Sequence, residues 1–116
     1  MKPIRIKRIY EEQSDDDGYR VLVDRIWPRG VSKTVANLDE WNKDVAPSTE
    51  LRKWFDHKEE RFEEFALRYR DELKAREEEL SNLREKANSE PMSLLYAAKS
   101  PKINHAIVLQ DVLLRG

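Results

Sequence analysis

The sequence contains no cysteine, and this absence excludes several kinds of chemistry at once. Disulfide bonds, thiolate nucleophiles, iron–sulfur clusters and cysteine-based zinc sites all require that residue. Histidine is scarce too, since only His57 and His105 occur in 116 residues. The 3 glycines lie far apart, so the chain has no glycine-rich loop of the kind that cradles phosphate groups.

Long hydrophobic runs and a net charge are also missing. The longest apolar runs are residues 94–98 and 106–109, whereas a membrane-spanning helix needs about 20 residues. Lys and Arg total 22 and Asp and Glu total 23, which gives a net charge of -1. Such a balance provides no overall basic field for binding DNA or a membrane surface. We expect a cytoplasmic protein without membrane contact, with nucleic acid disfavoured as a partner, and a single domain over residues 1–116.

Alternating and β-branched residues predict three or four short strands. Their expected ranges are 4–10, 19–23, 38–45 and 92–98. The uninterrupted run Val21-Leu22-Val23 is typical of a central strand that is covered on both faces, as in parallel sheets.

Capping residues and helical spacing predict the helices between these strands. Ser32 caps a short turn toward Ala36, and Ser48 and Thr49 precede a helix over 51–55. A capping box of Asp56 and Glu59 predicts a second helix start. The amphipathic stretch that follows forms one helix or two helices joined near Ala75, and a final helix covers 103–114 with Ser100 or Asn104 as its cap. This order predicts a small α/β domain, a layered sheet of about 3–4 strands flanked by helices.

The first candidate functional segment follows the predicted strand 19–23. It contains one carboxylate, two guanidinium groups and an indole: Asp24, Arg25, Arg29 and Trp27. Ligands bind at the carboxyl ends of strands in open α/β sheets, and arginine binds carboxylates and phosphates through paired hydrogen bonds. The alternative is that Asp24 pairs with one of the arginines and that Trp27 packs in the core.

The second candidate segment runs from Tyr96 to His105, after the last predicted strand. Asn104 and His105 lie near a helix N-terminus, where backbone N–H groups and the helix dipole favour anions. His105 is either a general acid or base there, or a hydrogen-bond donor to a bound anion, or a histidine that satisfies the loop backbone. His57 either reaches the same pocket or serves as a capping residue.

Several segments resemble a known family. They are 18–30 with its element Asp24-Arg25-Ile26-Trp27-Pro28-Arg29-Gly30, 38–41, 46–55, and 94–99 followed by 104–106. These segments are similar to the YeaO-like proteins, a bacterial and archaeal family known as domain of unknown function 488. The resemblance covers nearly the whole chain and implies a compact α/β domain, without implying a particular reaction.

The chain departs from the family pattern in two places. Broader relatives carry a Cys-x-His-like element after the last strand, where this chain has Asn104 and His105. A mechanism with a cysteine nucleophile at that position is therefore excluded. The resemblance also leads us to expect a glycine before His57, where this chain has Asp56.

Together these observations predict one polar pocket at the carboxyl edge of the sheet. Its expected lining is Asp24, Arg25, Arg29, His57, Asn104 and His105, with Trp27 and Tyr96 as walls. We expect it to bind a small anionic molecule such as a nucleotide or phosphate ester, and we expect no metal and no other cofactor. Arg25 and Arg29 would hold the anion, His105 would be the acid or base, and Asp24 would orient an arginine or histidine.

Two alternative functions stay open at this point. The sequence also leaves open whether the protein catalyses any reaction and what its oligomeric state is. The first is a nucleic-acid or regulatory binding module with a local basic patch of Arg5, Lys7, Arg8 and Arg25 beside Trp27. The second is a protein-interaction module that uses the charged helical stretch 61–86.

Overall fold

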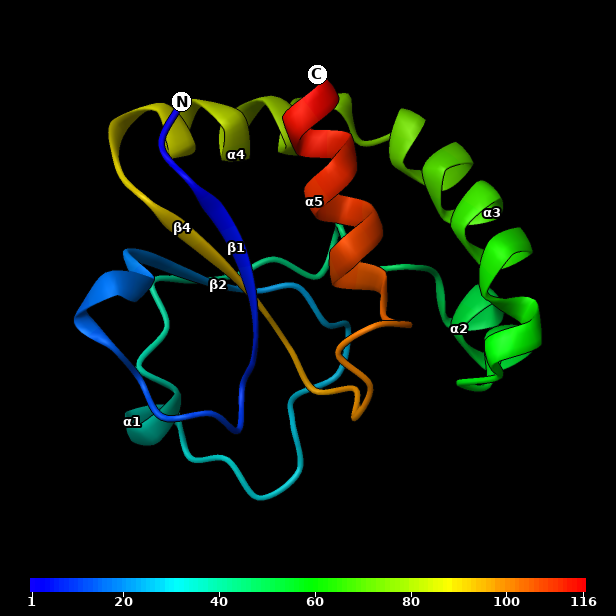
Figure 1. Ribbon diagram of the computed structural model, residues 1–116, viewed down its shortest axis with the longest axis horizontal. Coiled ribbons are helices and arrows are strands. Elements are labelled where there is room, and N and C mark those ends of the chain that lie inside the picture. Colours follow the sequence, from blue (N-terminus) through cyan, green and yellow to red (C-terminus); the bar gives the residue numbers. More distant parts are fainter.

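The computed structural model describes residues 1–116 and has a parallel four-stranded sheet at its centre (Figure 1). The strands are β1 (Ile4–Arg8), β2 (Tyr19–Leu22), β3 (Glu40–Trp41) and β4 (Met92–Tyr96), in the order β1-β4-β2-β3. Each neighbouring pair is parallel. All carboxyl ends therefore lie at one edge of the sheet, which is the lower edge in Figure 1. This confirms the predicted α/β class and the expected number of strands.

The strands are shorter than the sequence pattern suggested, for local reasons. β1 ends at Arg8, whose N–H donates to the Glu11 carboxylate at 2.9 Å as the chain turns. The strand expected over 38–45 is reduced to two residues, because Asn42 Oδ1 accepts the N–H groups of Asp44 and Val45. Hydrogen bonds from a side chain to nearby backbone compete with strand pairing in this way.

The helices are α1 (Lys33–Ala36), α2 (Thr49–Phe55), α3 (Phe62–Lys74), α4 (Glu77–Ser89) and α5 (His105–Arg115). Short 3₁₀ turns cover Asp15–Asp17 and Glu59–Arg61. Ser32, Ser48 and Asn104 are the N-caps of α1, α2 and α5, and each side chain accepts a backbone N–H. Of the two caps considered for the last helix, Asn104 is the correct one. No helix has both the length and the apolar character needed to cross a membrane.

The capping box expected at Asp56 and Glu59 is wrong. Asp56 instead ends α2, with its N–H donating to the Arg52 carbonyl and a left-handed φ of 48°. His57 follows with a φ of 54°, and α3 begins after a 3₁₀ turn without a side-chain cap. The expected glycine before His57 thus corresponds to a position whose backbone does favour glycine.

The sheet separates two apolar layers. The larger contains alternate residues of β2 and β4, such as Val21 and Leu94, together with buried residues of α2, α3, α4 and α5. The smaller joins Leu22 and Leu95 to Ala36 of α1 on the opposite face. The apolar stripes of α3 and α4 are buried in the larger layer: Phe65, Tyr69, Leu73, Leu80, Leu83 and Ala87. These stripes therefore belong to the core of the fold.

A buried ionic cluster links β1 and β2 to the 3₁₀ turn that lies between them in the sequence. Asp17 lies 2.9 Å from Lys7 and 2.5 Å from Arg20, whose side chain is only 3% exposed. Arg20 also donates to the Ala36 carbonyl at 2.7 Å, so the cluster reaches α1. Burial acts to raise the pKa of Asp17, but hydrogen bonds from Lys7, the Ser14 backbone and Arg20 outweigh it and lower that pKa below its usual value.

We expect Asp17→Asn to lower the free energy of unfolding by about 3 kcal/mol at neutral pH, because Arg20 becomes a buried charge without a full partner. The folded pKa of Asp17 is depressed, so this contribution is present above the unfolded pKa of about 4 and is lost as the pH falls through the folded value. Urea denaturation of both chains should show a constant difference from pH 8 to about pH 5 that shrinks below about pH 4. A difference that is already small at pH 7 would show the cluster to be dispensable.

Replacing Asp56 by glycine should stabilise the protein by about 0.5–1 kcal/mol, because glycine adopts a left-handed φ without the steric cost paid by other residues. Thermal unfolding of Asp56→Gly beside Lys58→Gly measures this effect. Lys58 has an ordinary φ of -86°, so glycine there should give no gain. Equal effects of the two substitutions would contradict the prediction.

Candidate functional site

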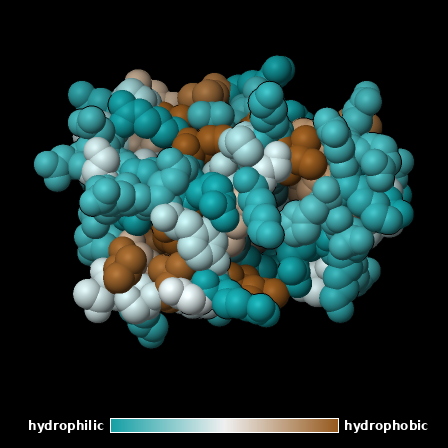
Figure 2. Space-filling model, turned by 60° about the horizontal axis from the view of Figure 1, so that its bottom comes forward, coloured by the Kyte–Doolittle hydropathy of each residue, from teal (hydrophilic) through white to brown (hydrophobic).

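A cleft of about 770 Å³ lies at the carboxyl edge of the sheet. Its walls come from residues 24–29 after β2, residues 97–105 after β4, and the C-terminal part of α2. The first two segments meet because β2 and β4 are neighbours in the sheet. Figure 2 turns this edge toward the viewer and shows a largely hydrophilic face with small, separate hydrophobic patches. The structure thus brings both predicted segments into one site.

Asp24 is the residue that joins these segments. Its Oδ2 accepts the N–H of Ala97 at 2.9 Å, which continues the β2–β4 pairing beyond the last strand residue. Its backbone carbonyl accepts the indole N–H of Trp41 at 2.7 Å. Its Oδ1 lies 3.0 Å from Nε2 of His105, the first residue of α5. The ends of three strands and one helix therefore converge on a single carboxylate residue.

The contacts of His105 define its tautomer. Nε2 lies 2.9 Å from the Val23 carbonyl and 3.0 Å from the Asp24 carboxylate, and both of these groups only accept hydrogen bonds. Nε2 must therefore carry a proton. Nδ1 makes no hydrogen bond within the protein, and it is not enclosed, because Asp24 Oδ1 is the one fully buried side-chain nitrogen or oxygen that lacks a hydrogen bond. His105 lines the cleft, so Nδ1 is its accessible basic atom.

Tyr69 of α3 packs against His105, with ring centroids 6.2 Å apart in an edge-to-face arrangement. Burial raises the pKa of the Tyr69 hydroxyl well above its usual value, and the nearby Asp24 and Glu72 carboxylates act in the same direction. The hydroxyl therefore stays protonated and donates a hydrogen bond to the Val45 carbonyl. This contact anchors the chain before α2 beside the histidine.

Arg25 is half-buried and held by backbone carbonyl groups. Its Nε donates to Pro47 at 3.1 Å and its Nη2 to Ala46 at 3.3 Å, so it fixes the entry to α2. It also lines a second, smaller cleft of about 280 Å³ together with Ser48 and Glu72. Glu72 in that cleft already accepts the backbone N–H and the hydroxyl of Ser48. Part of the Arg25 hydrogen-bonding capacity is thus used structurally.

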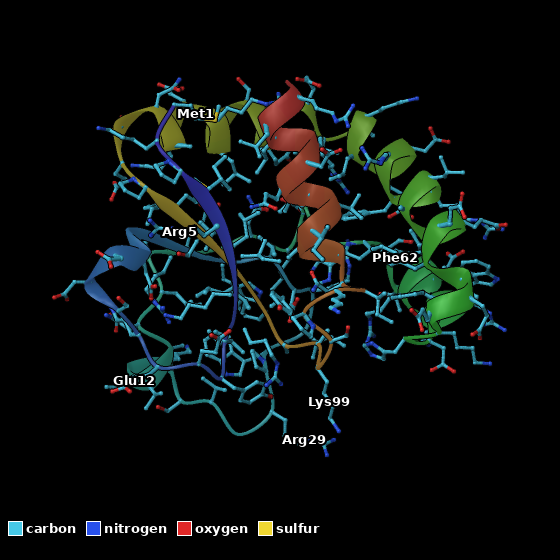
Figure 3. All side chains as sticks on the ribbon, in the orientation of Figure 1. Met1, Arg5, Glu12, Arg29, Phe62 and Lys99 are labelled. Atoms are coloured by element: carbon cyan, nitrogen blue, oxygen red, sulfur yellow. The ribbon has the colours of Figure 1, made fainter.

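Three other cations line the large cleft without any hydrogen bond or ion pair from their side chains: Arg29, Arg52 and Lys99. In Figure 3 the Arg29 and Lys99 side chains both extend from the carboxyl edge away from the sheet. Arg52 and Lys99 were not recognised as candidates from the sequence. Both lie within segments that resemble the family, but only the position of α2 and of the loop after β4 shows that they face the same space.

Trp27 and Ile26 form an apolar part of the wall. The indole N–H of Trp27 donates to the Val31 carbonyl at 2.7 Å, and its ring meets Trp41 edge to face at 5.2 Å. Trp27 was expected to be either a site residue or a core residue. It has both positions in part, because it packs against the smaller apolar layer and also lines the cleft. Ile26 is 57% exposed, which leaves an apolar surface available to a ligand.

Three predicted site residues have other surroundings than expected. Tyr96 is 2% exposed and belongs to the larger apolar layer, so it is not part of the cleft wall. Asn104 borders the cleft but is buried, and its amide is used to accept from Ile107 N–H and to donate to the Ser100 carbonyl. His57 is exposed at the lip of the cleft, on the left-handed turn after α2. No three His, Asp or Glu side chains gather in a way that could hold a metal ion.

Comparison with known proteins identifies the family. Residues 3–116 match the family model DUF488-N3i, described as "Inactive DUF488-N3 subclade". The chain is 47% identical over 110 residues to Uncharacterized protein YeaO of Escherichia coli K12, which covers 95% of this chain and 96% of that relative. It is 44% identical over 110 residues to Uncharacterized protein Rv3073c of Mycobacterium tuberculosis H37Rv, with 95% and 92% covered. No solved structure matches the chain. The resemblance noted in the sequence is therefore confirmed, and the chain belongs to the DUF488 family of YeaO-like proteins.

Proposed function

We propose that the protein binds a small anionic molecule, a phosphate ester or nucleotide, in the cleft at the carboxyl edge of the sheet. The observation that carries this proposal is the charge of the lining. Four cations line the cleft, namely Arg25, Arg29, Arg52 and Lys99, against one carboxylate, Asp24. The whole chain has almost equal numbers of acidic and basic residues, so this local excess favours an anionic ligand.

The accessibility of these cations supports the proposal further. Arg29, Arg52 and Lys99 have no partner in the protein, so their donors are free for a ligand. Hydrogen bonds between such cations and phosphate or carboxylate oxygens are roughly twice as strong as those between neutral groups.

The size and lining of the cleft favour an organic ligand over a bare inorganic ion. Its volume of about 770 Å³ lies within the range of roughly 300–1,000 Å³ that is usual for small-molecule sites. The exposed Ile26 and the Trp27 ring provide an apolar wall beside the cations. Such a combination suits a molecule with an anionic group and a flat or apolar part.

The proposed role is binding rather than turnover. The chain has no cysteine, and the family model that it matches is described as an inactive subclade. The hydroxyl oxygen of Ser100 in the cleft accepts the N–H groups of Lys102 and Ile103, and no base lies within hydrogen-bond distance of it. Nucleophile and base within hydrogen-bond reach are the usual mark of covalent catalysis.

The basic patch considered for nucleic-acid binding is less available. Arg5 donates to the Asp16 carbonyl, Lys7 to Asp17, and Arg8 to the carbonyls of Ala97 and Ala98. These cations already have partners within the fold, in contrast to the three free cations of the cleft.

Arg52→Ala should weaken binding about 10- to 100-fold, because a charge-assisted hydrogen bond contributes roughly 1.5–3 kcal/mol. The measurement is thermal unfolding and calorimetric titration with adenosine monophosphate, glycerol phosphate and inorganic phosphate. A probe at 100 times its Kd stabilises by about 2.7 kcal/mol, which raises the Tm of a domain this size by roughly 10 °C. Lys53→Ala is the matched control, because Lys53 is exposed on the same helix but does not line the cleft. Binding of no probe, or equal losses in both variants, would count against the proposal.

Salt should affect this binding only moderately. Raising the salt concentration from 50 to 200 mM is expected to weaken the binding of adenosine monophosphate by no more than about tenfold, since one anionic group is involved. A nucleic-acid site that makes 6–10 phosphate contacts loses about 10³–10⁵ over the same range. A parallel fluorescence titration with a single-stranded oligonucleotide distinguishes the small-molecule site from a nucleic-acid site. Tight oligonucleotide binding with a steep salt dependence would favour the nucleic-acid alternative.

A further inference from the structure

The pairing of Asp24 with His105 leaves one oxygen of the Asp24 carboxylate, Oδ1, without a hydrogen bond. Asp24 Oδ1 is fully buried and accepts no well-directed hydrogen bond, although His105 Nε2 lies 3.0 Å away. Nε2 lies at a similar distance, 2.9 Å, from the Val23 carbonyl. A buried carboxylate oxygen without a hydrogen bond lowers the stability of the folded protein, because it has lost its hydration without gaining a partner. A positive charge on the adjacent imidazole ring is the interaction that would compensate for it most directly.

The other ring nitrogen, Nδ1, has no hydrogen bond within the protein and is not fully buried, and His105 lines the cleft. Nε2 is held as a donor, so proton exchange on His105 takes place at Nδ1. A neutral ring presents a lone pair at Nδ1, which repels an anionic oxygen. A protonated ring presents an N–H that donates to the same oxygen, so anion binding and protonation of Nδ1 favour each other.

We propose that His105 takes up a proton from solvent at Nδ1 when the anion binds, that the Val23 carbonyl holds Nε2–H, and that the Asp24 carboxylate balances the charge of the ring. This inference rests on the proposed function. It specifies the ligand as an oxyanion acceptor, such as a phosphate monoester dianion, whose oxygen contacts Nδ1. Ligands that present only donors toward this atom are disfavoured.

The charges around the His105 ring explain why proton uptake should accompany binding of the anion. The titratable and charged groups that line the cleft with His105 or contact its ring are Asp24, Arg25 and Arg29 after β2, Arg52 and His57 at the end of α2, Tyr69 of α3, and Lys99 before α5. Tyr69 stays neutral because burial raises the pKa of its hydroxyl. In the free protein the cations repel a further positive charge on the ring and only Asp24 opposes them. A bound dianion reverses that balance.

The test is calorimetric titration of the full chain with adenosine monophosphate at pH 7.5, in buffers of different ionisation enthalpy. Uptake of up to one proton is expected, with the affinity rising by as much as tenfold per pH unit as the pH falls from about 8.5 to 7. Histidine is the only side chain that normally titrates between about pH 5 and 8. Titration of the ligand phosphate is common to every variant and cancels in the comparison.

The chain supplies its own matched control, because both of its histidines line the cleft. His105→Gln should lose the proton uptake and the pH dependence, whereas His57→Gln should retain them. Asp24→Asn preserves an acceptor for Ala97 but removes the charge, so its proton uptake should fall by at least half. Equal uptake in the two histidine variants, or none in the native chain, overturns the inference while the anion-binding function stands.

Nitrogen NMR of the imidazole rings provides a second readout that needs no folded variant of His105. The His105 ring should be protonated at Nε2 in the free protein and at both nitrogens after saturation with adenosine monophosphate, with assignment from the spectrum of His57→Gln. A neutral Nδ1–H tautomer, or a ring unchanged by saturation, contradicts the inference. If no anion of the panel binds, the proposed function itself fails and this inference fails with it.

Discussion

The carboxylate of Asp24 holds together the parts of the molecule that form the cleft. A parallel sheet brings the carboxyl ends of its strands to one edge, but it does not by itself fix the loops that follow them. Asp24 does so, because it accepts the Ala97 N–H after β4 and lies against His105 at the start of α5. Its backbone carbonyl accepts from Trp41 at the end of β3. The shape of the cleft therefore depends on one residue, which joins these segments and also lines the cleft.

Charged groups in this protein separate into two populations. Asp17, Arg20 and Lys7 are enclosed and mutually compensated, so they contribute to the fold and offer nothing to a ligand. Arg29 and Arg52 are exposed at the cleft and have no partner. In a chain with a net charge of -1, each of these arginines would gain from a nearby carboxylate, and the fold supplies none. A ligand anion is the partner that this arrangement leaves room for.

Local patterns in the sequence were sufficient for most of the fold. The strands, the N-caps of α1 and α2 and the break between α3 and α4 follow from spacing and capping chemistry that act within a few residues.

Two errors arose where local signals competed. Asp56 and Glu59 fit a capping box, but the left-handed backbone at Asp56 ends α2 instead. Tyr96 was placed in the pocket from its position after an apolar run, yet strand alternation turns it into the larger apolar layer. Arg52 and Lys99 were missed because their convergence depends on tertiary packing of α2.

The composition of the site favours recognition over turnover for a physical reason. Covalent catalysis needs a nucleophile next to a base, and neither His105 Nδ1 nor the imidazole of His57 has a hydroxyl or thiol hydrogen-bonded to it. What the cleft retains is a set of free cations, an apolar wall and an imidazole whose Nε2 lies against the Val23 carbonyl and the Asp24 carboxylate. In the proposed function, each of these groups would stabilise a bound anion without changing it.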